Sequence, residues 1–485
     1  MGETDLSSSM DSEPGEEKKE DRKPTYDGYA ESPIVSGDVK ITLDKDGIIL
    51  DTLFDRSVIH YADIYSFTFQ NYTFHVSTAL GNITFSRMGN SCEWLYRELL
   101  ETYNKKVLQA FLVEGSAEFE TNAQCALTEN GSVYETSGKV QIFKDCLCIM
   151  PPNTSGRRFP FVFMNGMKKD GYSLTLTMRS GESCTFSKLG YDLDSLEKKI
   201  SDNIRALREK EVEFIKKLDG SLGMTEISRA VKLLPEGIAA PFEKLSESLP
   251  SLASAILNKI NDSTMKESYS LLKKVCDIKN LCIGVKSVSA PKENSLSANP
   301  PDALQGLAAS AVSAHERPTD ETSKSQPDEL EEVKTKWILW VAVPSIDHNT
   351  VVVEFAFPDE DAATFIFNIE GKWEQFIDVL NRSMEAINLQ REVLSLSDEE
   401  LKKEKHADYR MLVVRTPVVH TLRKQFAGRV IHRTSESWLN GISAYVNKAS
   451  KVPVKLDGCK AAFCTSCGAK LVAGIKFCRQ CGEKL

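Results

Sequence analysis

Four cysteines near the carboxyl end of this 485-residue chain have a spacing that predicts a definite chemistry. They form two Cys-x-x-Cys pairs, Cys464 with Cys467 and Cys478 with Cys481. Two such pairs can place four thiolates around one tetrahedral zinc ion, and a site with four cysteine ligands leaves no open coordination position. The pattern therefore predicts one structural zinc ion and argues against catalysis by the metal.

The segment that carries these cysteines is itself a short repeat. Phe463-Cys-x-x-Cys-Gly-x-Lys-Leu471 matches Phe477-Cys-x-x-Cys-Gly-x-Lys-Leu485, and the glycine after each second cysteine permits the positive φ that such a turn demands. These residues resemble the short zinc-ribbon family, whose members carry paired Phe-Cys-x-x-Cys-Gly-x-x-Leu hooks. The resemblance covers residues 463–485 only, and it implies a structural zinc without a particular activity.

Other uses of the four thiolates fit the sequence less well. Iron in a rubredoxin-like site remains chemically possible, although zinc is favoured for so short a ribbon. A redox-active dithiol is disfavoured because neither pair lies at the start of a helix beside a strand. A segment this small cannot fold on apolar burial alone, so metal binding must supply on the order of 10 kcal/mol or more.

The other eight cysteines have no regular spacing, and we expect them to pack as buried thiols. Cys146 and Cys148 alternate in a strand-like run and should point to one face, but no second pair lies nearby to complete a metal site. The remaining six are Cys92, Cys125, Cys184, Cys276, Cys282 and Cys459.

We find no sequence pattern typical of an enzyme. The chain has no phosphate-binding glycine loop, no His-x-x-x-His pair and no nucleophile elbow. Its histidines are scattered and none stands apart: His60, His75, His315, His348, His406, His420 and His432. The expectation is a protein that is not an enzyme.

Between the two ends of the chain lies an internal repeat. Tyr72 precedes a turn glycine, Gly81, by nine residues, and Tyr172 precedes Gly181 by the same interval. In both copies a Thr-Phe-Ser-basic-apolar-Gly sequence and then a helical pattern follow. Each copy should therefore be an alternating hairpin closed by an amphipathic helix.

A small curled antiparallel sheet capped by a carboxyl-terminal helix is similar to the pleckstrin-homology-like fold. The repeat predicts that Phe85 and Phe186 occupy equivalent buried positions in the two copies. A weaker third copy follows a Ser-, Ala- and Pro-rich linker. We expect Trp94 and Trp373, just inside the helices of the first and third copies, to be core anchors.

The expected fold class is multidomain α+β, since the length favours roughly three domains. The predicted parts are a disordered acidic tail (1–35), pleckstrin-homology-like modules 1 (36–110) and 2 (115–210), a helical segment (211–285), a linker (287–333), a third sheet-plus-helix module (334–392), a basic, mainly helical segment (393–458) and the zinc ribbon (459–485).

The net charge of −9 hides an asymmetry along the chain. Residues 401–485 contain 17 Lys and Arg against 5 Asp and Glu, a net +12, so residues 1–400 carry −21. Clustered basic residues precede the ribbon: Arg410, Arg415, Arg423, Lys424, Arg429 and Arg433. This segment could bind nucleic acid or could lie against the acidic body of the protein.

We therefore expect a non-enzymatic, zinc-binding adaptor or scaffold whose tandem modules bind protein partners. The alternative is a nucleic-acid or transcription-machinery factor that uses the basic segment and the ribbon. Lipid binding ranks third, with Arg157, Arg158, Lys168 and Lys169 as its candidate residues. The amino terminus has no signal-peptide core and no apolar run is long enough to span a membrane, so the expected location is the cytoplasm.

Overall fold

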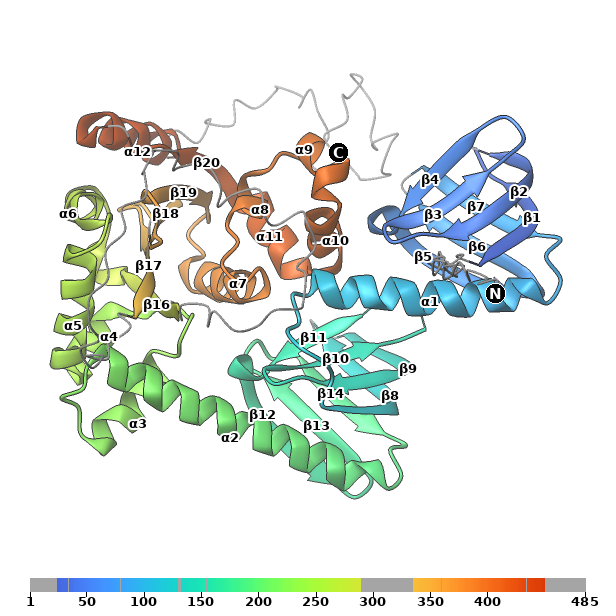
Figure 1. The fold of residues 1–485 in the computed structure, drawn as a ribbon. Coiled ribbons are helices and arrows are strands. Elements are labelled where there is room, and N and C mark those ends of the chain that lie inside the picture. The colour runs from blue at the N-terminus through green and yellow to red at the C-terminus, as the bar shows by residue number, and fades with distance from the viewer. Residues whose placement is uncertain are drawn as a thin grey trace, which may run out of the picture. The chain divides into compact units, whose positions relative to one another are not determined.

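The computed structural model describes residues 24–33, 35–78, 80–129, 132–152, 156–288, 335–358, 360–432 and 434–449 (Figure 1). The chain divides into two compact units. Unit 1 comprises Met1–Ile200 and Asp398–Arg415, and unit 2 comprises Ser201–Ser397 and Thr416–Leu485. The four predicted zinc ligands lie outside the described residues.

Unit 1 contains two seven-stranded antiparallel sheets of identical strand order. The orders are β4-β3-β2-β1-β7-β6-β5 and β11-β10-β9-β8-β14-β13-β12, so adding seven to each strand number of the first sheet gives the second. The strands are β1 (Thr25–Glu31), β2 (Ser36–Leu43), β3 (Gly47–Asp51), β4 (Arg56–His60), β5 (Ile64–Gln70), β6 (Thr73–Thr78), β7 (Gly81–Ser86), β8 (Phe119–Glu129), β9 (Ser132–Ile142), β10 (Cys146–Met150), β11 (Arg157–Pro160), β12 (Met164–Asp170), β13 (Ser173–Met178) and β14 (Ser183–Ser187).

A helix follows the last strand of each sheet, as the repeat predicts. Helix α1 (Ser91–Ala110) follows β7, and α2 (Asp192–Leu218) follows β14 and continues into unit 2. The turn glycines Gly81 and Gly181 have φ of +120° and +87°, values that favour glycine. Phe85 and Phe186 are both 0% exposed, so their prediction as equivalent buried residues is confirmed.

The prediction for Trp94 is wrong, because its side chain is 62% exposed. The buried face of α1 is formed by residues three or four positions apart, such as Cys92, Leu95 and Leu99, and position 94 lies off this stripe. Trp373 is half-buried and stacks on Phe376 with ring centroids 6.3 Å apart.

The first sheet also begins earlier than expected. Strand β1 falls within the expected acidic tail of residues 1–35, yet it pairs with both β2 and β7 and its Ala30 is fully buried. The strand was missed because its sequence, TYDGYAE, is short of large apolar residues. The first module therefore starts at Thr25 and not at residue 36.

Unit 2 is built on one six-stranded antiparallel sheet of order β15-β16-β17-β18-β19-β20. Its strands are β15 (Ala240–Pro241), β16 (Cys282–Val288), β17 (Lys336–Pro344), β18 (Thr350–Ala356), β19 (Ala363–Asn368) and β20 (Phe426–Val430). Its helices include α3 (Met224–Leu233), α4 (Phe242–Ser248), α5 (Pro250–Asn261), α6 (Lys266–Val275), α7 (Trp373–Ala386), α8 (Glu392–Ser395), α11 (Pro417–Gln425) and α12 (Ser435–Ala449).

This sheet corrects the expectation of a separate third module at 334–392. Strand β16 begins in the expected helical segment 211–285 and ends in the expected linker 287–333, and β20 comes from the expected basic helical segment 393–458. Val288 pairs with Lys336, so the segment between them, which held most of the predicted linker 287–333, is inserted in a hairpin. Residues 289–334 lie outside the described part of the chain.

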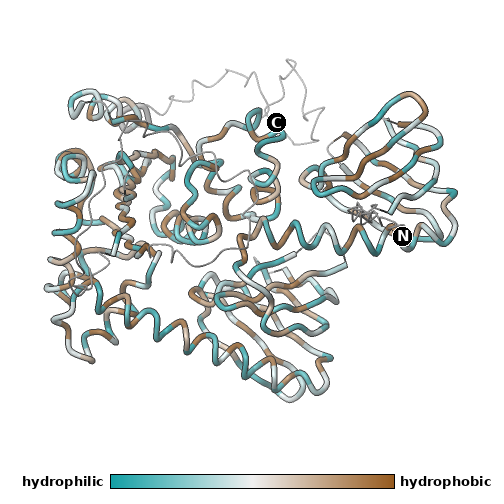
Figure 2. The backbone as a smooth tube through the Cα atoms, viewed as in Figure 1, coloured by the Kyte–Doolittle hydropathy of each residue, from teal (hydrophilic) through white to brown (hydrophobic). Residues whose placement is uncertain are grey.

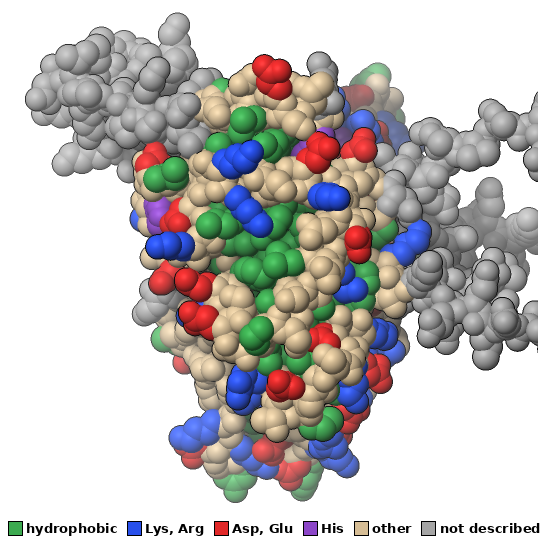
Figure 3. Space-filling view, turned by 90° about the vertical axis from the view of Figure 1, so that its left-hand side faces the viewer, with side chains coloured by type: hydrophobic (Ala, Val, Ile, Leu, Met, Phe, Trp, Pro, Cys, Tyr) green, Lys and Arg blue, Asp and Glu red, His purple; other side chains and the backbone are tan. Residues whose placement is uncertain are grey.

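The core of unit 2 lies where helices pack on this sheet. Buried residues of α5 and α6 join those of β16, β17 and β18 in one hydrophobic cluster, and Figure 2 shows the apolar character of these strands. Figure 3 shows the face of the molecule that lies on the left-hand side of Figure 1. Apolar side chains on this face are surrounded by charges of both signs, so the face has no concentrated positive charge. Among the described residues, no helix is both long and apolar enough to cross a membrane.

Candidate functional site

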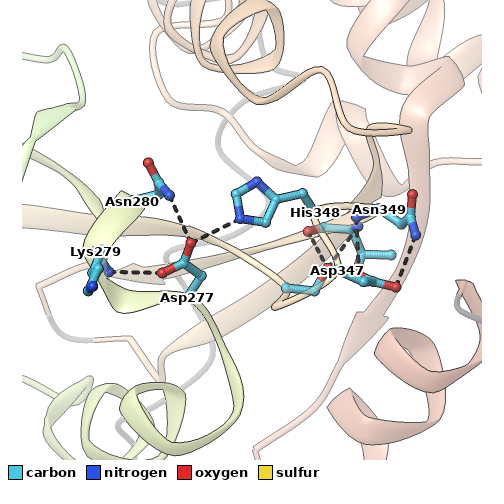
Figure 4. A network of polar contacts seen from close by, with 8 residues as sticks. Asp277, Lys279, Asn280, Asp347, His348 and Asn349 are labelled. Atoms are coloured by element: carbon cyan, nitrogen blue, oxygen red, sulfur yellow. Dashed lines mark hydrogen bonds and ion pairs between the residues drawn. The ribbon is translucent and has the colours of Figure 1, made fainter.

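Two histidines of unit 2 lie within ion-pair distance of acidic side chains. The first, His348, lies at the β17–β18 turn (Figure 4). The Nε2 atom of His348 lies 2.9 Å from Oδ2 of Asp277, whose other neighbour Asn280 donates from its side chain to the same oxygen at 2.8 Å. Asp347 accepts from the hydroxyl of Ser345 at 2.6 Å and from the backbone N–H of Asn349 at 3.1 Å. The bonds to Asp347 and from Asn280 lie within turns, whereas the His348–Asp277 contact joins residues 71 positions apart, so the network ties the β17–β18 turn to the segment before β16.

This network should make unit 2 sensitive to acid. The side-chain hydrogen bond from Asn280, followed by the contact with His348, lowers the pKa of Asp277. A lowered carboxyl pKa stabilises the fold fully above the unfolded-state value of about 3.9, and the stabilisation is lost as pH falls through the folded-state value.

We therefore expect urea unfolding of the wild type to shift to lower midpoints between about pH 5 and pH 2, with a shallower decline in Asp277→Asn. Parallel pH profiles for the two proteins would show that Asp277 contributes nothing to this dependence.

The second histidine lies beside a fully buried carboxylate. Glu354 of β18 is 0% exposed; its Oε1 lies 2.9 Å from Nε2 of His432 and accepts from the hydroxyl of Ser268 at 2.7 Å. Thr364 donates to Oε2 of Glu354 at 2.5 Å and accepts from Nε1 of Trp438 at 2.7 Å. Because all these groups satisfy one another, the cluster is best understood as the polar attachment of α6 and α12 to the sheet.

Sequence reasoning missed this cluster. Glu354 stands in an otherwise apolar strand, Val351-Val-Val-Glu-Phe, and a lone acidic residue there could have signalled a buried partner. His432 follows it by 78 positions, so no local pattern joined the two.

The described basic residues of the carboxyl-terminal segment are mostly engaged within their own units. Arg410 pairs with Asp63 and Arg415 donates to the carbonyl of Ile64 in unit 1. In unit 2, Arg423 donates to the carbonyl of Val393, and the guanidinium of Arg429 lies 5.6 Å from the ring centroid of Phe365. Lys424 is exposed, and Arg433 lies outside the described residues.

The lipid-binding candidates of the second module are also paired with acids. Arg157 lies 2.8 Å from Glu129, and Arg158 lies 3.2 Å from Asp145. Lys169 contacts two carboxylates of α2, and Lys168 lies 4.0 Å from Asp170. These pairs leave little concentrated positive charge for a phosphorylated headgroup, which argues against the lipid hypothesis.

The described cysteines are buried free thiols, as expected. Burial raises the pKa of Cys276 and of Cys282 to about 12, so both stay protonated and unreactive at neutral pH. Within the described ranges, no group of three or more His, Cys, Asp or Glu side chains could hold a metal ion. The predicted zinc ligands Cys464, Cys467, Cys478 and Cys481 lie outside these ranges.

One known protein family matches the segment that contains the four predicted zinc ligands. Residues 463–485 match the zinc-ribbon domain. The match contains all four predicted ligands and begins at Phe463, the first residue of the paired hooks. No curated protein matches the chain.

The zinc ribbon binds metal through thiolates, which must lose their protons before they coordinate the ion. The match supports zinc binding at the carboxyl end of the chain.

Proposed function

We propose that this protein is a non-enzymatic, cytoplasmic zinc-binding adaptor that binds protein partners through its two amino-terminal modules. The observation that carries the proposal is the duplicated sheet of unit 1, in which two sheets share one strand order and each is followed by a helix. We assign both to the pleckstrin-homology-like fold, a scaffold that serves many binding functions. The zinc ribbon at residues 463–485 adds a structural site that binds one zinc ion.

The polar chemistry of the described residues supports a binding role over a catalytic one. The Asp277 and Glu354 clusters each bond to backbone or neighbouring side chains in ways that close turns or hold helices. The Glu354 cluster does place the hydroxyls of Ser268 and Thr364 beside a carboxylate, but Ser268, Thr364 and Glu354 are only 3%, 0% and 0% exposed. A nucleophile must reach its substrate, so these buried hydroxyls fit a structural role better than a catalytic one.

The alternative is a nucleic-acid-binding or transcription-machinery-associated factor, and Arg423 tests it directly. Because Arg423 donates to the carbonyl of Val393, Arg423→Gln should lower the free energy of unfolding by about 1–3 kcal/mol. The matched variant Lys424→Gln removes an exposed charge and should change it by no more than about 0.5 kcal/mol. Urea denaturation measures both.

Nucleic-acid affinity is the second measurement on the same variants. We expect neither wild type nor variants to bind a labelled DNA duplex or single-stranded RNA at micromolar concentration in physiological salt. Binding that weakens equally for all sequences in both variants, with a flatter salt dependence, would favour the alternative.

The adaptor role is tested by purification of the full chain and of a chain ending at residue 449 from source cells. The cut after residue 449 keeps β20 and α12, which the sheet of unit 2 needs, whereas a cut after residue 400 would remove both. We expect the same protein partner with both chains. Nucleic acid that copurifies with the full chain and disappears from the shorter one would contradict the proposal.

A further inference from the structure

One helical segment of unit 1 comes from a distant part of the sequence. Helices α9 (Asp398–Leu401) and α10 (Ala407–Arg415) belong to unit 1, whereas the chain before Asp398 and after Arg415 belongs to unit 2. Helix α10 packs against α1 and against the 3-10 turn η1 (Tyr61–Asp63) that precedes β5. We call residues 398–415 the docked segment.

Arg410 attaches the docked segment to η1 through a two-point ion pair. Its Nε atom lies 2.9 Å from Oδ1 of Asp63, and its Nη2 donates to Oδ2 at 3.2 Å. Its Nη1 also donates to the carbonyl of Leu401 at 2.8 Å, which holds the guanidinium in place. The Arg410 side chain is 11% exposed and that of Asp63 is 31% exposed, so the pair is partly shielded from water, and its two contacts make it specific in geometry.

Arg415 makes the second attachment, at the first residue of β5. Its Nη2 donates to the carbonyl of Ile64 at 2.5 Å, and its guanidinium lies 5.4 Å from the ring centroid of Tyr103. Burial lowers the pKa of Arg415, and the neighbouring Tyr103 opposes that shift. A charge buried in this way is stable only while its partners are present, so the contact is selective for the surface that supplies them.

Three of the four residues between the two arginines are buried apolar side chains. Met411, Leu412 and Val413 are 4%, 2% and 7% exposed. The docked segment therefore presents two arginines five positions apart, with three buried apolar side chains between them. A helix of nine residues has little stability alone in water, so its order depends on docking.

We propose that η1, Ile64 and α1 form a helix-docking site for a partner helix with the Arg-apolar pattern of α10, and that α10 occupies this site in cis. The inference rests on the proposed adaptor function and names its first binding surface. Because α10 is tethered, it competes at a high effective concentration, and a partner binds appreciably only when α10 is released.

The duplicated module shows which feature gives the site its specificity. The turn η2 (Phe161–Phe163) of the second sheet corresponds to η1, and Phe163 stands where Asp63 stands in the first. Phe163 is buried and uncharged, so the second module has no carboxylate at this position to pair with an arginine. We therefore expect helix docking at the first module only.

A fluorescent peptide of residues 398–416 tests the proposal against the full-length chain. Arg410→Ala with Arg415→Ala weakens the cis contact, and this opened chain should bind the peptide at least tenfold more tightly than the wild type does. Adding Asp63→Arg to the opened chain should remove binding, and a peptide with Arg410→Glu should restore it. Equal binding to wild-type and opened chains, or binding that ignores residue 63, would overturn the proposal.

Hydrogen exchange on the wild-type chain gives a second test that does not need a stable opened variant. Excess peptide should speed amide exchange in α10 by displacing it, without changing exchange in α7 of unit 2. Unchanged exchange in α10 at saturating peptide would also overturn the proposal. If the peptide binds but no protein partner copurifies, the proposed docking site is supported and the proposed adaptor function is not. The two proposals can therefore fail separately.

Discussion

We expect the purified protein to contain about one zinc ion per chain, and Cys464→Ser or Cys478→Ser to remove it. Each substitution takes one thiolate from a four-thiolate set, and three thiolates hold zinc far more weakly than four. Since metal binding supplies on the order of 10 kcal/mol for so small a segment, the ribbon should lose its fold together with its metal. Elemental analysis of protein purified without chelator measures the stoichiometry.

Cys459→Ser is the matched control, because Cys459 precedes the family match by four positions and is not a predicted ligand. It should keep the full metal content. The thermal unfolding of unit 1 and of the described part of unit 2 should be the same in all three variants, since no described side chain contributes to the predicted site. Metal-free protein would contradict the prediction, and iron in place of zinc would show that the rubredoxin-like alternative was the correct one.

The duplication in unit 1 could be predicted because its signals are local in sequence. Turn glycines, alternating apolar residues and the following helix all lie within about thirty residues in each copy, and each constrains its own neighbourhood. Strand β1 gave no such signal, since its pairing with β2 and β7 depends mostly on backbone hydrogen bonds and one buried residue, Ala30.

Unit 2 could not be predicted in the same way, because its sheet is assembled from strands far apart in the chain. The pairing of Val288 with Lys336 crosses an insertion. Strand β20 joins β19 although five α-helices, which belong to two different units, lie between them in the sequence. A stretch of apolar residues predicts a strand, but it does not say which strand lies beside it. The expected third copy failed for this reason.

The candidate sites also differ in whether their residues are close together or far apart in the sequence. Cys464, Cys467, Cys478 and Cys481 carry a local signal, because metal ligation requires a short, fixed spacing, and their role as ligands stays a prediction. The pairs Glu354 with His432 and Asp63 with Arg410 join residues that are distant in sequence, so only the fold brings them together. Net charge predicted that the basic segment would meet an acidic surface or a polyanion, but it could not say which.

The two equivalent phenylalanines should be the most sensitive core positions of unit 1. Phe85→Ala or Phe186→Ala should each lower the free energy of unfolding by about 3–5 kcal/mol, because each removes a fully buried ring and leaves a cavity. Phe54→Ala is the matched control: its ring is 97% exposed, so the change should be within about 0.5 kcal/mol. Urea denaturation of the full chain measures all three.

The neighbours of the two rings predict which loss is larger. Phe85 lies opposite Ala30 and Phe74, and it stacks on Phe74 with ring centroids 5.8 Å apart. Phe186 lies at the corresponding place opposite Cys125 and Leu174, where no second ring is present across the strand. Since an aromatic pair contributes about 0.5–1.5 kcal/mol beyond its buried area, Phe85→Ala should exceed Phe186→Ala by about that amount. A tolerated substitution at either position would mean that the two sheets share a strand order without sharing a core, and the argument for duplication would fail.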